Sequence, residues 1–258
     1  MAKFKGTNGD DTLNAGGGDD MLVGKGGNDY ISGGLGDDHM MGGAGDDRMD
    51  GGDGADHFKG GEGIDTADYS TATSGVTVYY HSATATGAAT GDTFEQMENL
   101  IGSAYDDNLQ AADGGMSFGG FGNDALYGAD YGGTGNAGTL RGDQGNDQLY
   151  MGYGDTRAWV QLGQGADTIY SFDEGSDLFF IDLSEFGLGT SLESNEITNS
   201  NTATAFGSNA QFIYEDDAAR LWFDSNGSAA GGLSLVAQLS GASIDNHNLG
   251  VDDFEFQL

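Results

Sequence analysis

A single apolar residue recurs every nine positions between Gly6 and Asp68. Polar residues flank it, so each apolar residue lies in a short alternating segment, which is typical of a β-strand with one buried face. The glycine-rich residues between these segments can take the positive φ values of tight turns. The pattern therefore predicts short strands that alternate with turns. The recurring apolar residues are Leu13, Leu22, Ile31, Met40, Met49, Phe58 and Ala67.

The seven nine-residue units follow the scheme GGxGxDxUx, in which U is the apolar residue and the sixth position is always aspartate. If two units form one coil of a parallel β-solenoid, equivalent residues stack every eighteen positions, about 4.8 Å apart. The aspartates then form one ladder on each edge of the solenoid. The first ladder is Asp11, Asp29, Asp47 and Asp65, and the second is Asp20, Asp38 and Asp56.

Stacked aspartates need a cation. Two unit charges at this spacing repel by roughly 3–4 kcal/mol at an effective dielectric constant near 20. Calcium suits the arrangement because it accepts six to eight oxygen ligands, which carboxylates and turn carbonyls can supply. Zinc does not, since the chain has no cysteine and only four histidines. We expect roughly five complete sites in this run, with metal binding and folding as one event.

Further candidate ligands stand at the fifth position of the units. These are Asp10, Asp19, Asn28, Asp37 and Asp46.

The repeat returns in a looser form between residues 102 and 170. Its sixth-position residues are Asp107, Asp124, Asp147 and Asp167, with Asn123 and Asn146 at the fifth position. The aspartates are 17, 23 and 20 residues apart instead of eighteen, so we expect loops to bulge out at 128–139 and 151–159. The two runs together predict on the order of six to ten calcium ions.

These patterns divide the chain into four segments. Residues 1–68 form a first β-roll, 69–101 an inserted segment, 102–170 a second roll and 171–258 a C-terminal β cap. The insertion contains a predicted strand at 76–80 and a helical or turn segment at 93–100. Residues 210–241 predict two or three antiparallel strands with a turn at 225–227, which would cover the last coil. The pattern leaves open whether the rolls are one solenoid or two packed domains.

Composition narrows the range of partners. The chain has 42 acidic and 8 basic residues and a formal charge of −34. Nucleic acid is not expected as a partner because phosphate recognition needs clustered basic residues, and anionic membranes are disfavoured for the same reason. The sequence shows no transmembrane run and no amino-terminal signal peptide.

With these nonads, the chain resembles the RTX family, the haemolysin-type calcium-binding proteins of Gram-negative bacteria. Residues 65–80 and 98–109 resemble the segment that precedes the roll in many RTX proteins, and 212–228 resemble the family's C-terminal cap. The ending VDDFEFQL is similar to the uncleaved signal that type I secretion systems read. The resemblance implies an extracellular protein that is exported unfolded and folds on meeting millimolar calcium.

We expect a non-enzymatic calcium-binding protein of the cell surface or matrix, because no HExxH or GxSxG motif occurs. Loops at 69–101 and 128–161 would contact acidic polysaccharide or a neighbouring protein. The alternative is a calcium-binding accessory or secretion module of a larger RTX enzyme of the protease, lipase or alginate epimerase type. Family enzymes carry their catalytic region ahead of the roll, so a reading frame that continues upstream of Met1 would favour the module. A third possibility is activity in the inserted loops.

Two local features each have more than one interpretation. Six aromatic residues are candidates for a sugar-binding platform or for packing: Trp159, Trp222, Tyr127, Tyr131, Tyr150 and Tyr153. Asp224 to Gly227 resemble the start of an EF-hand loop, but Leu235 stands where the bidentate glutamate is needed, so we interpret the segment as a turn.

Overall fold

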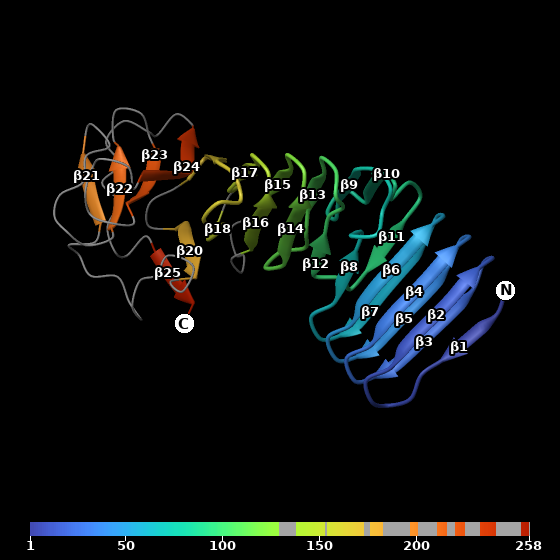
Figure 1. The fold of residues 1–258 in the computed structure, drawn as a ribbon. Coiled ribbons are helices and arrows are strands. Elements are labelled where there is room, and N and C mark those ends of the chain that lie inside the picture. The colour runs from blue at the N-terminus through green and yellow to red at the C-terminus, as the bar shows by residue number, and fades with distance from the viewer. Residues whose placement is uncertain are drawn as a thin grey trace.

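The computed structural model describes residues 1–128, 138–152, 154–172, 176–182, 197–200, 211–215, 220–224, 233–240 and 254–257. The regular elements of these residues are all β-strands, which confirms the predicted all-β roll. No helix in this part of the chain could span a membrane. Figure 1 shows the strands stacked along the molecule, with the N-terminal coils at one end and the C-terminal strands at the other.

The strands form three sheets. The N-terminal sheet contains β1 (Lys3–Lys5), β3 (Met21–Gly26), β5 (His39–Ala44), β7 (His57–Glu62) and β11 (Thr93–Glu95). The continuous sheet contains β2 (Thr12–Gly17), β4 (Tyr30–Leu35), β6 (Arg48–Asp53), β8 (Thr66–Asp68), β12 (Asn99–Ile101), β14 (Met116–Phe121), β16 (Thr139–Gln144), β18 (Arg157–Val160), β20 (Leu178–Asp182) and β25 (Phe254–Gln257). The C-terminal sheet contains, in spatial order, β10 (Thr84–Gly87), β9 (Val76–Tyr79), β13 (Asn108–Gln110), β15 (Ala125–Tyr127), β17 (Gln148–Tyr150), β19 (Asp167–Tyr170), β24 (Leu233–Ser240), β23 (Arg220–Asp224), β22 (Gln211–Glu215) and β21 (Ile197–Ser200).

The register of the first run is the predicted one. Leu13 pairs with Ile31 and Ile31 with Met49 in the continuous sheet, and Leu22 pairs with Met40 in the N-terminal sheet. Each pair is eighteen residues apart, so two units form one coil. The apolar eighth-position residues from Leu22 to Phe58 are at most 1% exposed and form the core between the two sheets.

The strands of the first run are longer than the sequence pattern predicts. β3, for example, covers six residues, of which Met21 to Val23 end one unit and Gly24 to Gly26 begin the next. Only the fourth to sixth positions therefore form the turn. The glycine-rich half of the unit can join the sheet because a coil that stacks directly on an identical coil continues the main-chain pairing through it.

The insertion joins the two rolls without interrupting the continuous sheet. Ala67 of β8 pairs with Leu100 of β12, so the chain returns to the same sheet after the insertion, and β11 adds a last strand to the N-terminal sheet on the way. The opposite wall changes at this point, because the N-terminal sheet ends at β11 and the C-terminal sheet begins with the β9–β10 hairpin. One wall of the solenoid is thus a single continuous sheet, and the opposite wall consists of two separate sheets.

The segment at 93–100 forms two short strands, where the sequence predicts helix or turn. β11 pairs with β7, and Phe94 stacks on the ring of Phe58 with a centroid separation of 5.3 Å. Pairing to an existing sheet edge and the packing of Phe94 on a core aromatic ring outweigh the weak local preference of this segment.

The irregular spacing of the second run comes from extra residues between strands. Leu126 and Leu140 are fourteen positions apart instead of nine, so the additional residues fall between β15 and β16, where the bulge at 128–139 was expected; residues 129–137 of it lie outside the described residues. The second bulge was predicted at 151–159, but Leu149 and Ala158 keep the regular nine-residue step. The additional residues lie between Ala158 and Ile169.

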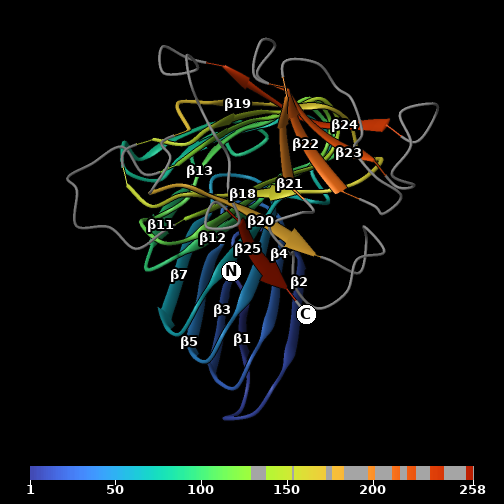
Figure 2. The same cartoon turned by 90° about the vertical axis from the view of Figure 1, so that its left-hand side faces the viewer.

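The C-terminal cap combines antiparallel and parallel pairing. β22, β23 and β24 form the predicted antiparallel strands, which Figure 2 shows in front of the coils. β24 and β25 in turn join the roll in parallel, beside β19 and β20 respectively. The predicted turn at 225–227 lies outside the described residues.

Candidate metal-binding turns

The sixth-position aspartates lie in turns, yet their side chains are buried. Seven of them are at most 2% exposed: Asp29, Asp38, Asp47, Asp56, Asp65, Asp124 and Asp147. Each stands directly before a strand whose eighth-position residue enters the core, so the carboxylate lies at the edge of the roll between successive coils.

One carboxylate oxygen of each aspartate ties two coils together. The backbone N–H of Asp20 donates to Oδ1 of Asp38 over 2.7 Å, and the N–H of Asp38 donates to Oδ1 of Asp56 over 2.8 Å. The same bond joins Asp11 to Asp29, Asp29 to Asp47, Asp47 to Asp65, Asp107 to Asp124, Asp124 to Asp147 and Asp147 to Asp167. The stacked ladders predicted from the sequence are therefore present in both runs.

The second oxygen, Oδ2, is buried and has no hydrogen-bond partner in those seven aspartates. It points at the first-position glycine of its own unit. A Cβ on Gly24, for example, would overlap Oδ2 of Asp29 and lie 2.7 Å from the carbonyl oxygen of Gly42 in the next coil. A carboxylate oxygen and a main-chain carbonyl oxygen thus share a small space that only glycine leaves open.

These turns fit a hard cation. A buried carboxylate oxygen without a donor is unfavourable, and a metal ion supplies the missing positive charge. No three acidic or histidine side chains of the described residues converge on one point, so main-chain carbonyls would have to complete the ligand set. Carboxylate together with carbonyl oxygen is a ligand set that calcium accepts.

Burial raises the pKa of these carboxyls. Loss of solvent is the main cause at Asp56, whose pKa rises to about 7, and at Asp124, whose pKa rises to about 8; neighbouring carboxylates add to both increases. The same cause raises the pKa of Asp65 to about 6 and that of Asp167 to about 8. The ladders therefore disfavour their own ionisation when no cation is bound.

The fifth-position residues form a second, outer ladder. Asp37, for example, is exposed, and its Oδ1 accepts the N–H of Ala55 over 3.0 Å. Asp10, Asp19, Asn28, Asp46, Asn123 and Asn146 accept the N–H of the stacked residue in the same way. The structure gives these predicted ligands a role in holding turns together, with one oxygen already occupied by a backbone donor.

Three ladder residues were missed by the sequence pattern. Asp92 accepts the N–H of Asp56, Glu98 that of Asp65 and Asp177 that of Thr156, over 2.8–2.9 Å. Asp92 precedes the partly buried Phe94 by two positions, as Asp-Thr-Phe, and Asp177 precedes the buried Phe179 in the same way, as Asp-Leu-Phe. This spacing matches the last four positions of the nonad, which contain no glycine. Glu98 likewise precedes the buried strand residue Leu100 by two positions, as Glu-Asn-Leu, with glutamate in place of the repeat's aspartate.

Between residues 102 and 170, the second run has an aspartate ladder on one edge only. It consists of Asp107, Asp124, Asp147 and Asp167. On the opposite edge, the residues that precede β14, β16 and β18 are Gly115, Gly138 and Thr156. We therefore expect fewer ions per coil in the second run than in the first.

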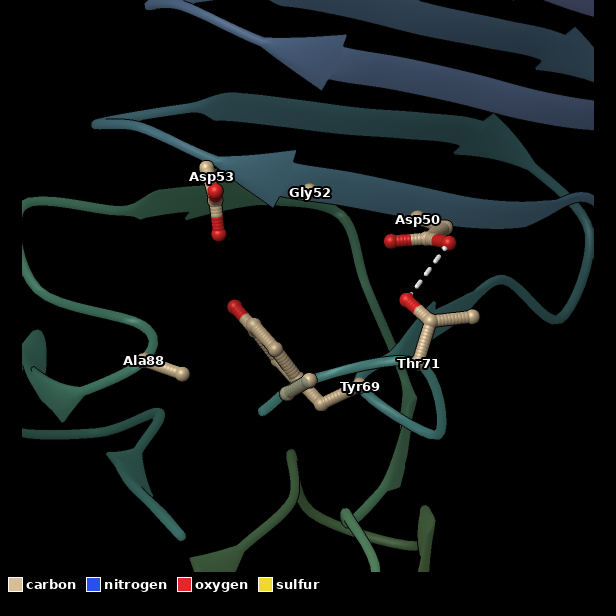
Figure 3. Close-up of a pocket in the computed structure, with 7 residues that line it drawn as sticks. Asp50, Gly52, Asp53, Tyr69, Thr71 and Ala88 are labelled. Carbon is tan, nitrogen blue, oxygen red and sulfur yellow. Dashed lines mark hydrogen bonds between the residues drawn. The ribbon is translucent and has the colours of Figure 1, made fainter. Parts of the chain in front are cut away.

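A small pocket lies where the insertion leaves the first roll (Figure 3). Asp50 and Asp53 of β6 face Tyr69 and Thr71 across it, and the Thr71 hydroxyl donates to Asp50 over 3.0 Å. The buried Tyr69 hydroxyl donates to Oδ2 of Asp92 over 2.7 Å. The pocket thus lies at the seam between the insertion and the end of one ladder.

Comparison with known families matches residues 4–31 and 32–67 to the RTX calcium-binding nonapeptide repeat (4 copies). No curated protein gives a significant match. Among solved structures, the chain is similar to the crystal structure of extracellular lipase LipA from Serratia marcescens, with 19% sequence identity and a TM-score of 0.37. That alignment covers 98% of this chain and 39% of the lipase chain.

Proposed function

We propose that this chain, which carries RTX calcium-binding nonapeptide repeats, is an extracellular, non-enzymatic protein that folds when calcium enters its turns. The observation that carries the proposal is the set of seven buried Oδ2 atoms without a hydrogen-bond donor. Each of the seven turns would hold one ion between its aspartate and main-chain carbonyl oxygens, such as that of Gly42 beside Asp29 and that of Gln96 beside Asp65.

Calcium concentration would decide whether the chain is folded. Calcium sites of extracellular modules commonly have dissociation constants of about 10⁻⁴–10⁻³ M, well above cytosolic calcium. At low calcium, the stacked carboxylates oppose folding through desolvation and mutual repulsion. A chain of this kind stays unfolded inside a cell and folds outside, which agrees with the resemblance of its last residues to a type I secretion signal.

Circular dichroism and native mass spectrometry test this role. On titration with calcium, the purified chain should change cooperatively from disordered to β-rich, and excess EGTA should reverse the change. Native mass spectra of the folded chain should show about seven bound ions. A chain that remains fully β-structured and free of metal in EGTA would exclude the proposal.

An anionic polysaccharide is the partner that the surface of the N-terminal sheet favours. Two columns of side chains alternate with the core residues of this sheet and face outward: Lys3, Met21, His39, His57 and Thr93 in one, and Lys5, Val23, Met41, Lys59 and Glu95 in the other. Glu95 is the one carboxylate among these ten residues, and it pairs with Lys59 over 2.9 Å. On a chain with a charge of −34, this sheet face is of basic and apolar character.

The aromatic platform is a less suitable place for a sugar. Tyr127, Tyr150 and Tyr170 stack on one another with ring separations of 4.6–4.7 Å, so their faces are covered by neighbouring rings. Trp159 packs against Phe180 and beneath Arg141. Tyr131 and Tyr153 lie outside the described residues.

A glycan array with the calcium-loaded chain tests the partner. The chain should bind polyuronates in preference to neutral glycans, and the double variant Lys3→Glu, Lys5→Glu should bind them more weakly with an unchanged calcium midpoint for folding. Equal binding by the variant would remove this face as the contact. A parallel screen for turnover of polysaccharides and esters, with calcium and with EGTA, tests the non-enzymatic assignment.

A further inference from the structure

Three aspartate ladders end at a carboxylate whose Oδ2 is paired. At the N-terminal end, Oδ2 of Asp11 accepts the backbone N–H of Thr7 over 2.5 Å and its hydroxyl over 2.9 Å. Thr7 occupies the second position of its unit, where most other units have glycine.

The same arrangement opens the second run. Oδ2 of Asp107 accepts the N–H of Ser103 over 2.6 Å, and the Ser103 hydroxyl lies 2.9 Å from Oδ1 and 3.1 Å from Oδ2. Asp107 is 1% exposed; the N–H of Val76 donates to Oδ1, and the donors of Ser103 are the partners that replace solvent at Oδ2. At the seam, the 4% exposed Tyr69 donates its hydroxyl proton to Oδ2 of Asp92.

The backbone distinguishes these ends from the other turns independently of the hydrogen bonds. In all seven turns with an unpaired Oδ2, the second-position residue has a positive φ, from 63° at Asp143 to 132° at Gly61. Thr7, Ser103 and Ala88, the equivalent residues before Asp11, Asp107 and Asp92, do not. At Thr7 and Ser103 the N–H group consequently turns toward the carboxylate.

We propose that the turns of Asp11, Asp92 and Asp107 bind no calcium, because hydroxyl and N–H donors occupy the place that the ion takes at the other seven. Each of these ladders is closed at one end by proton donors of the protein itself. These ends are satisfied without metal, so the ions are confined to the interior of each ladder. The inference rests on the proposed calcium-dependent folding and assigns which turns take part in it.

Matched asparagine variants of the full chain test the assignment by ion count. Native mass spectrometry at saturating calcium should give Asp107→Asn the same number of ions as the wild type and Asp124→Asn at least one fewer. Asp92→Asn and Asp56→Asn form a second pair with the same expected contrast. This pair decides the question if circular dichroism shows that a variant of the first pair does not fold.

The assignment is overturned if Asp107→Asn or Asp92→Asn loses an ion as its partner variant does. A wild-type chain that binds no calcium would instead contradict the proposed function. The two failures are therefore distinguishable in one set of spectra.

Discussion

At the scale of single residues, the first-position glycines keep open the space beside each buried carboxylate. Gly24 and Gly26 belong to the same unit and differ in this respect. A Cβ at Gly24 would overlap Oδ2 of Asp29, whereas a Cβ at Gly26 would be 3.6 Å from the carbonyl oxygen of Ala44, which is an ordinary contact.

We expect Gly24→Ala to raise the calcium midpoint for folding and to lower the free energy of unfolding by about 1–3 kcal/mol, the usual effect of overpacking. Gly26→Ala should change it by less than about 0.5 kcal/mol. Urea denaturation in saturating calcium, with circular dichroism as the readout, measures both. Equal effects would mean that the space beside Asp29 has no special role.

Lys25 is a residue where the sequence departs from the backbone that the roll requires. It stands at a second position with a φ of 98°, a conformation that favours glycine. We expect Lys25→Gly to stabilise the calcium-loaded chain by about 1 kcal/mol through relief of strain. Lys25→Ala keeps the strain and loses the bond from the ammonium group to the carbonyl of Gly6, so it should not stabilise. The two variants compared in the same urea series separate strain from the side-chain contact.

At the scale of elements, each turn has an inner and an outer acid with different tasks. Asp38 is buried with an unpaired Oδ2, whereas Asp37 is exposed and accepts the N–H of Ala55. We expect Asp38→Asn to raise the calcium midpoint severalfold, because it removes negative charge from the stacked site. Asp37→Asn keeps an acceptor for Ala55 and should leave the midpoint nearly unchanged. A calcium titration followed by circular dichroism would count against this division if both variants shifted equally.

The repeat predicts the ladders but not the division of tasks within them. The period of nine residues suffices to stack Asp29 on Asp47, since register follows from the apolar eighth position. The sequence does not reveal that Asp10 and Asp37 hold turns together, because both positions are simply acidic. Asp92 and Glu98 were missed because they follow an insertion that removes the glycines, and main-chain pairing rather than local pattern returns their strands to the sheets.

At the scale of the whole molecule, one wall is continuous and the other is not. Thirty-three residues separate Ala67 from its partner Leu100, a distance in sequence that no period predicts. Leu149 and Ala158 likewise keep the nine-residue step where we predicted a bulge, because the extra residues fall after β18. Insertions are therefore located by the pairing of strands, and the sequence shows only that the spacing is irregular.

The charge of the whole chain makes pH the sharpest global test, because protons and calcium compete for the same carboxylates. Burial raises the pKa of Asp56 to about 7 and that of Asp124 to about 8, against a usual 3.8 in an unfolded chain. A group whose pKa is higher in the folded state stabilises that state when protonated, and this contribution is lost as the pH rises through the folded pKa. In calcium-free buffer, the chain should therefore gain β-structure as the pH falls from 8 toward 4.

With calcium present, the effect of pH on folding reverses. Ions bind the deprotonated carboxylates, so the calcium midpoint should rise as the pH falls from 8 to 5. Circular dichroism titrations at several pH values, with and without EGTA, measure both arms, and buffers of equal ionic strength control for general charge screening. A midpoint independent of pH over this range would mean that the buried aspartates are not the groups that bind calcium, since displacement of their protons is what couples the two titrations.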